Sequence, residues 1–138
     1  MNADVCIFCK IASGEIPCIK VYEDQEVLAF LDIGPVSDGH TLVIPKEHFE
    51  NLALCPDEIL AKISSCLGKI STAVASAMQA DGYNVLCNNG RAAGQLVDHV
   101  HFHIIPRKEE DGVSDRWCAY KYKEGQAETI ARKISEKL

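Results

Sequence analysis

The sequence lacks the features that mark exported, membrane-spanning or repetitive proteins. Its first ten residues contain no basic stretch followed by an apolar core, so we expect no leader peptide. No apolar run approaches the length that crosses a bilayer, so we expect no membrane partner. The sequence between Cys6 and the expected C-terminal helix contains no internal repeat, no low-complexity run and no Gly/Ser/Pro linker. These absences predict a single domain over residues 1–138.

Positive charge is also scarce. The chain has 14 Lys and Arg against 20 Asp and Glu, which gives a formal net charge of -6. Such a chain has no overall attraction for a polyanion, so duplex nucleic acid is not an expected partner. A small phosphate ligand is still compatible with this charge, because a few backbone amides and local cations hold one or two phosphates.

The seven cysteines are odd in number and mostly scattered through hydrophobic stretches. This pattern is typical of reduced thiols and predicts a cytoplasmic location. Only Cys6 and Cys9 look paired, with a two-residue gap that lets two thiolates bind one zinc ion. A tetrahedral site needs two further ligands, and no second Cys-x-x-Cys exists, so a redox dithiol or two unrelated buried thiols remain alternatives.

Hydrophobic periodicity predicts an α+β fold with a mainly antiparallel sheet. Period-two patterns and turn signals indicate five strands, the second with one face formed by Val27, Ala29, Leu31 and Ile33. The expected strands are residues 19–23, 27–33, 41–46, 83–88 and 98–106.

Two helices are expected. Apolar residues recur every three or four positions from Ile59 to Met78, which predicts one long central helix. Pro56 suits its first turn, and Gly82 suits a left-handed cap at its end. A second amphipathic helix is expected near residues 126–137.

Three histidines lie in one expected strand. Because side chains alternate along a strand, His99, His101 and His103 project to one face and their neighbours to the core. Three titratable rings in one row occupy positions where apolar side chains would stabilise the fold more. Their presence therefore favours a functional site. The residues alone leave zinc binding and phosphate chemistry open. The preceding glycine-bearing loop favours phosphate, since its backbone amides can approach an anion closely.

The sequence resembles the histidine-triad (HIT) family of nucleotide hydrolases and transferases along almost its whole length. The resemblance implies the HIT-like α+β fold, with a five-stranded sheet, a long central helix and a C-terminal helix. It is carried by residues 7–11, 15–17, 30–33, Pro35, His40, 42–46, Gly94, Gln95 and 99–105.

The resemblance implies a hydrolase that cleaves nucleotidyl compounds, foremost adenylyl ones, through a covalent nucleotidyl-histidine on His101. Phosphoramidates, acyl nucleotides and dinucleoside polyphosphates are the substrate classes it leaves open, and a purine nucleotide such as AMP is the expected ligand. His103 would contact the phosphate and Asp32 the ribose. The expected base pocket comprises Ile7, Phe8, Ile11, Ile16, Phe30 and Ile33. The other expected phosphate contacts are Asn88, Gly94, Gln95 and Leu96.

Leu96 departs from the phosphoramidase branch of the family, which often has serine at this position. A leucine side chain cannot hydrogen-bond to a leaving group, so the preference for phosphoramidates over other nucleotidyl compounds is left open. A nucleotide-binding dimeric scaffold with weak or vestigial catalysis is therefore the alternative function.

The resemblance to the zinc-bearing bacterial members of the family implies two further metal ligands beside the cysteine pair. By position, His48 and His99 would complete a structural Cys2His2 Zn²⁺ site with Cys6 and Cys9, which leaves His101 free of metal. The resemblance also implies a homodimer in which two sheets join. A catalytic metal held by all three triad histidines is the third alternative. The only carboxylate in the triad strand is Asp98, and alternation places it on the face opposite the histidines.

Overall fold

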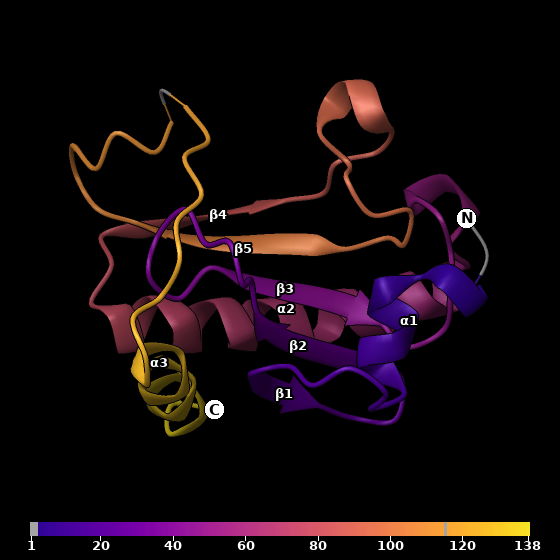
Figure 1. Cartoon of the computed structure of the whole chain (residues 1–138), viewed down its shortest axis with the longest axis horizontal. Helices are drawn as coiled ribbons and strands as arrows, with labels where there is room; N and C mark the ends of the chain where they lie inside the picture. The colour runs from indigo at the N-terminus through magenta and orange to yellow at the C-terminus, as the bar shows by residue number, and fades with distance from the viewer. Residues whose placement is uncertain (1–2, 115) are drawn as a thin grey trace.

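The computed structural model describes residues 3–114 and 116–138, and its centre is a five-stranded antiparallel sheet (Figure 1). The spatial order is β1-β2-β3-β5-β4, and each neighbouring pair is antiparallel. The strands are β1 (Lys20–Glu23), β2 (Val27–Leu31), β3 (Thr41–Pro45), β4 (Gly82–Leu86) and β5 (Phe102–Arg107). The expected fold class is confirmed.

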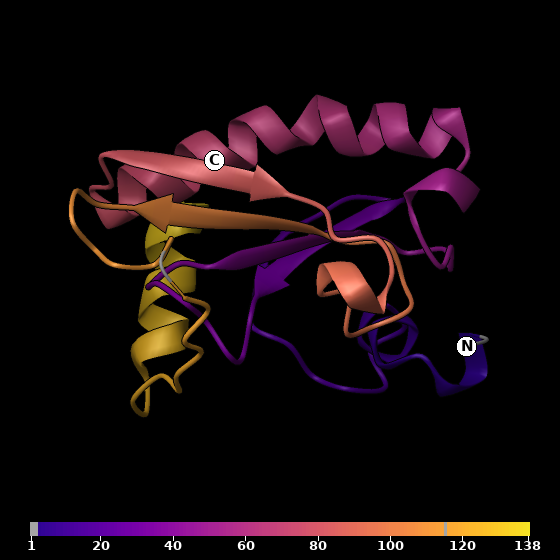
Figure 2. The same cartoon turned by 90° about the horizontal axis from the view of Figure 1, so that it is seen from above.

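The helices lie on both sides of this sheet. The long helix α2 (Asp57–Met78) runs along one face, and α3 (Gln126–Ser135) packs beside it at one end, whereas α1 (Ile7–Ala12) lies on the opposite side (Figure 2). Short 3-10 turns are η1 (Ala3–Val5), η2 (Leu52–Leu54) and η3 (Arg91–Ala93). Among the described residues, no helix is long and apolar enough to span a bilayer.

Alternation along β2 creates two separate cores. Val27, Ala29 and Leu31 join the larger core under α2 and α3, as their spacing predicts. Leu28 and Phe30 point the other way and pack with α1 in a smaller core. That smaller core consists of Cys6, Phe8, Leu28, Phe30, Leu42 and Ile44. The N-terminal helix is thus fixed to the sheet face opposite α2.

The strand that carries the triad is shorter than expected. It begins at Phe102, so His99 and His101 precede it rather than lie within it. Pro45 in the adjacent strand has no N–H, and its carbonyl oxygen accepts a hydrogen bond from His99 Nε2 at 2.8 Å instead of from a backbone amide. A side-chain contact therefore replaces the ladder at this point.

Other boundaries also differ from the expected ones. β2 ends at Leu31, and Ile33 beyond it is 84% exposed. The left-handed residue at the end of α2 is Gln79, with φ 52°, whereas Gly82 begins β4. Sequence periodicity does not predict helix α1, because six residues are too few to show a helical period.

Candidate functional site

A cavity of about 780 Å³ lies between α1, the end of β2, the loop after β4 and the segment around Trp117. Its volume is in the range of small-ligand sites. The predicted residues that line it are Ile7, Phe8, Ile11, Phe30, Asp32, Ile33, Asn88, Gly94, Leu96, His101 and His103. Residues far apart in the chain therefore meet around one space.

Two expected residues do not line this cavity. The place expected for Ile16 is taken by its neighbours Pro17 and Cys18. Gln95 is only 3% exposed, and its side chain holds the loop together. Its Oε1 accepts from the Gly90 amide at 2.8 Å, while its Nε2 donates to the carbonyls of Glu50 and Val97 at 2.6 and 3.0 Å. Gln95 thus shapes the loop from behind.

His101 is held in one neutral tautomer. Its Nδ1 lies 2.7 Å from the His99 carbonyl oxygen, which can only accept, so Nδ1 bears the proton. Nε2 then carries a lone pair on a residue that lines the cavity. The Phe8 ring packs edge-to-face against this imidazole at 5.1 Å. Burial lowers the pKa of His101, so the neutral form dominates near pH 7.

His40 belongs to the site although sequence reasoning gave it no role. The Val36 amide donates to His40 Nδ1 at 3.1 Å, which places the His40 proton on Nε2. His40 Nε2 donates in turn to His103 Nδ1 at 2.8 Å, and neutral His103 therefore has its proton on Nε2. The signal in the sequence is a histidine immediately before a largely apolar strand.

The cavity is nearly neutral apart from one acid. Burial lowers the pKa of His40 to about 3 and that of His103 to about 4. Asp32 Oδ2 lies 3.5 Å from His40 Nε2, and burial raises the pKa of this carboxyl group. Among the described residues, no lysine or arginine lines the cavity. An anionic ligand in this cavity would therefore meet neutral N–H groups rather than cationic side chains.

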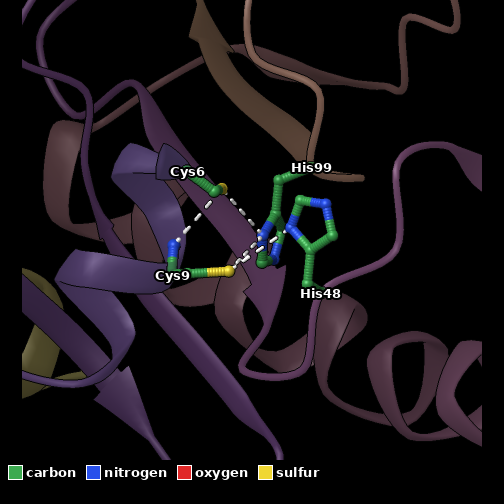
Figure 3. Close-up of side chains that lie close together, drawn as sticks. All are labelled: Cys6, Cys9, His48 and His99. Carbon is green, nitrogen blue, oxygen red and sulfur yellow. Dashed lines mark hydrogen bonds between the residues drawn. The ribbon is translucent and has the colours of Figure 1, made fainter. Parts of the chain in front are cut away.

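A second group of side chains lies beside the cavity, where Cys6, Cys9, His48 and His99 converge (Figure 3). Cys9 Sγ is 3.3 Å from His48 Nδ1 and 3.5 Å from His99 Nδ1, and Cys6 Sγ is 3.4 Å from His99 Nδ1. The hydrogen bond from His99 Nε2 to Pro45 leaves Nδ1 as a lone pair that faces the sulfurs. All four ligand atoms lie within 4.8 Å of one another.

This donor set fits a closed tetrahedral metal site. Two thiolates and two neutral imidazoles are ligands that zinc favours, and a carbonyl that orients one imidazole is the usual outer contact. A nucleophilic dithiol fits less well, because burial and the neighbouring Cys6 raise the pKa of the Cys9 thiol to about 12. Asp32, His40 and His103 also lie close together, but the hydrogen bond from His40 to His103 and the 3.5 Å contact between His40 and Asp32 account for that arrangement.

Comparison with known proteins agrees with this fold. The family model described as the HIT domain matches residues 13–110, and the chain belongs to this family. It is 47% identical to adenosine 5′-monophosphoramidase hnt1 of Schizosaccharomyces pombe over 134 residues, which is 96% of this chain and 98% of that protein.

Two further relatives extend the comparison. Adenylylsulfatase HINT3 of Arabidopsis thaliana is 50% identical over 106 residues, 77% of this chain and 54% of that protein. The structure is similar to that of a zinc-bound histidine triad family protein from Mycobacterium smegmatis, with a TM-score of 0.84 and 36% identity, covering 99% of this chain and 94% of that one. Relatives of this chain therefore include named nucleotide hydrolases and a zinc-bound protein.

The buried His40–His103 pair generates a prediction about pH. We expect His40 to stay neutral until about pH 3, whereas the unfolded chain takes up this proton near pH 6.5. Between these values the unfolded state binds more protons, so stability falls as pH falls, by about 1.4 kcal/mol per pH unit for this group. NMR titration of the His40 ring checks this, with the urea-unfolded chain as control. Titration of folded His40 near 6.5 would contradict it.

Proposed function

We propose that the protein hydrolyses adenylyl compounds and releases AMP, with His101 Nε2 as the nucleophile that attacks the α-phosphorus. The observation that carries this proposal is the hydrogen bond from His101 Nδ1 to the His99 carbonyl. This bond leaves Nε2 unprotonated, and neutral imidazole is a competent nucleophile near pH 7. The carbonyl also stabilises the positive charge that the ring acquires when Nε2 bonds to phosphorus.

The reaction proceeds in two displacements. In the first, the Nε2–P bond forms as the bond from phosphorus to the leaving nitrogen or oxygen breaks. In the second, water attacks phosphorus and the electron pair of the Nε2–P bond returns to His101. Overall, the hydroxyl of water ends on phosphorus and its proton on the leaving group. The Nε2–H of His103, set by His40, donates to a phosphoryl oxygen in both steps.

The rest of the cavity suits a purine nucleotide. Asp32 is placed by its own turn, since its Oδ1 accepts from the Gly34 amide at 2.8 Å. Its other carboxylate oxygen is then available for ribose hydroxyls. Phe8 and Phe30, packed edge-to-face at 5.6 Å, offer an apolar wall for the base, with Ile7, Ile11 and Ile33 around it. Asn88 and the backbone at Gly94 and Leu96 complete the phosphate end.

The nucleophile assignment is tested by His101→Ala. We expect AMP release from an adenosine phosphoramidate to fall about 10⁴-fold or more, because no other group replaces the nucleophile. Chromatography of AMP measures turnover, and calorimetric titration with AMP tests whether the variant still binds the product.

The same experiment separates the two functional classes. Unchanged turnover in His101→Ala would refute the assignment of His101 as the nucleophile. A wild-type protein that binds AMP but releases none from phosphoramidates, acyl nucleotides or dinucleoside polyphosphates would favour the nucleotide-binding scaffold instead. The named activities of the phosphoramidase and adenylylsulfatase relatives support the enzyme.

We further propose that Cys6, Cys9, His48 and His99 hold a structural Zn²⁺ ion. The compact donor set and the zinc-bound relative support this proposal. Zinc bound there supplies a cross-link between segments and no catalytic step. The ion would fix the start of α1 in place, because Cys6 is the N-cap residue of this helix and its Sγ accepts a hydrogen bond from the Cys9 amide at 3.4 Å.

Substitution of one cysteine tests the zinc proposal. We expect about one zinc ion per wild-type chain purified without chelator, and loss of zinc with a lower melting temperature in Cys9→Ser. Cys118→Ser is the matched control, because Cys118 is exposed and lies outside the group. Mass spectrometry measures the metal and calorimetry the melting. A well-folded, metal-free wild type in which Cys6 and Cys9 titrate as free thiols would refute the proposal.

A homodimer and a cytoplasmic setting complete the proposal. β4 is an outer strand of the sheet and exposes Tyr83 and Val85, which are 45% and 42% accessible. An exposed apolar edge strand is suited to pairing with another strand, and a second copy of β4 is the proposed partner. The seven free cysteines are consistent with a reducing compartment.

Light scattering tests the dimer. We expect a mass of twice the 15.1 kDa chain, and a shift to the monomer mass in Val85→Lys, because a charge on the paired edge opposes association. Leu54→Lys is the control, since Leu54 is 60% exposed and lies on η2, which is not part of the sheet. A wild-type protein of monomer mass at micromolar concentration would contradict the dimer.

A further inference from the structure

Helix α1 takes part in two separate sites. One is the cysteine–histidine group, which comprises Cys6, Cys9, His48 and His99 (Figure 3). Cys6 is the N-cap residue of α1, and Cys9 lies in its first turn. The other site is the cavity, which α1 lines with Ile7, Phe8 and Ile11. A restraint on the helix at its cysteines therefore also acts on the cavity wall.

Few restraints other than side-chain contacts fix α1 in place. A helix of six residues is marginal by itself, because isolated helices need about 12–15 residues to form in water. Among the described residues, the backbone hydrogen bonds of residues 3–16 stay within this segment, and none joins it to the sheet. The attachment of α1 therefore depends on the smaller core and on what the two thiols bind.

Phe8 is the side chain that joins the two sites directly. It is buried, and its ring packs edge-to-face against His99 at 5.9 Å, His101 at 5.1 Å and Phe30 at 5.6 Å. His99 belongs to the cysteine–histidine group, whereas His101 and Phe30 line the cavity. Such ring contacts are directional, so a shift of Phe8 weakens all three of them. The base wall and the cysteine–histidine group therefore share one ring.

A metal ion in the cysteine–histidine group would restrict a motion that a nucleotide otherwise has to restrict. Two ligands come from α1, while His48 follows β3 and His99 precedes β5, so the ion would hold the helix against the sheet. A ligand that binds to an already ordered wall loses less conformational entropy. Two ligands that order the same segment therefore bind cooperatively without touching each other.

We propose that zinc binding and nucleotide binding are coupled through α1 and Phe8, so that the zinc-loaded protein binds AMP about tenfold more tightly than the zinc-free protein. The inference rests on the proposed function, because it takes the cavity as the nucleotide site and the cysteine–histidine group as the zinc site. By linkage, a bound nucleotide strengthens zinc binding by the same factor. Zinc thereby regulates the affinity of the site and takes no part in the reaction.

Calorimetric titration with AMP and with adenosine tests the coupling. The protein is titrated as purified, after zinc has been removed with a chelator that is then dialysed away, and after zinc has been restored. We expect the Kd for AMP to rise about tenfold without zinc and to return when zinc is restored. Adenosine lacks the phosphate and should lose the same factor, because Phe8 acts on the base wall. A loss confined to AMP would overturn the route through Phe8.

Two further readouts follow the metal and the helix themselves. In competition with a chromophoric chelator, saturating AMP should raise the zinc affinity of the protein about tenfold. In hydrogen exchange, the amides of α1 should exchange faster after zinc removal, while those of β2 remain unchanged. Faster exchange in both elements would overturn the inference, because zinc would then support the whole fold. Unchanged exchange in α1 would also overturn it.

A substitution at Phe8 tests its role as the joining residue. We expect Phe8→Leu to keep its zinc and to bind AMP more weakly, with zinc removal changing that affinity less than about threefold. Phe102→Leu is the matched control, because Phe102 is half-buried against the larger core and belongs to neither site, so the full effect of zinc should remain. Undiminished coupling in Phe8→Leu would refute the role of Phe8.

The outcomes separate this inference from the proposed function. Equal AMP affinity in zinc-loaded and zinc-free wild type would overturn the coupling and leave the hydrolase intact. A zinc-loaded protein that binds neither AMP nor adenosine would refute the nucleotide site, and the coupling with it. A purified wild type without zinc would refute the metal site and the coupling, but not the hydrolase.

Discussion

The way His99 is held constrains both candidate sites. Its ring is fixed at one end by the hydrogen bond from Nε2 to the Pro45 carbonyl, and its Nδ1 therefore faces Cys6 and Cys9. Its own carbonyl accepts from His101 Nδ1 and so selects the tautomer with a lone pair on Nε2. One residue thus orients a metal-ligating nitrogen through its side chain and the proposed nucleophile through its backbone.

Phe8 connects the same two sites through packing. It lies between the two cysteines in sequence and packs edge-to-face against His99 at 5.9 Å and His101 at 5.1 Å. Because Cys6 caps α1, a metal bound by the cysteines would hold the helix that supplies Ile7, Phe8 and Ile11 to the cavity. A structural ion there would order these three side chains in advance and so lower the conformational entropy lost when a nucleotide binds against them.

Sequence periodicity predicts the sheet and the long helix well, because in β2 and in α2 the spacing of apolar residues follows directly from which face is buried. The alternation of Val27, Ala29 and Leu31 reflects burial under α2, and the three-to-four spacing in α2 reflects the same core. Contacts between distant segments were not predictable in this way. The start of β5, the role of Gln95 and the bond from His40 to His103 depend on backbone carbonyls and rings brought together only by folding. The family pattern predicts that His101 is the nucleophile, but the position of its proton follows from a carbonyl two residues away, which the pattern does not reveal.

A site built from neutral groups limits which phosphates it can hold. The His103 Nε2–H and backbone amides are dipoles, and dipoles stabilise one phosphoryl charge far better than a row of charges. Burial keeps His101 neutral, which preserves its nucleophilicity but removes a cation that would attract polyanions.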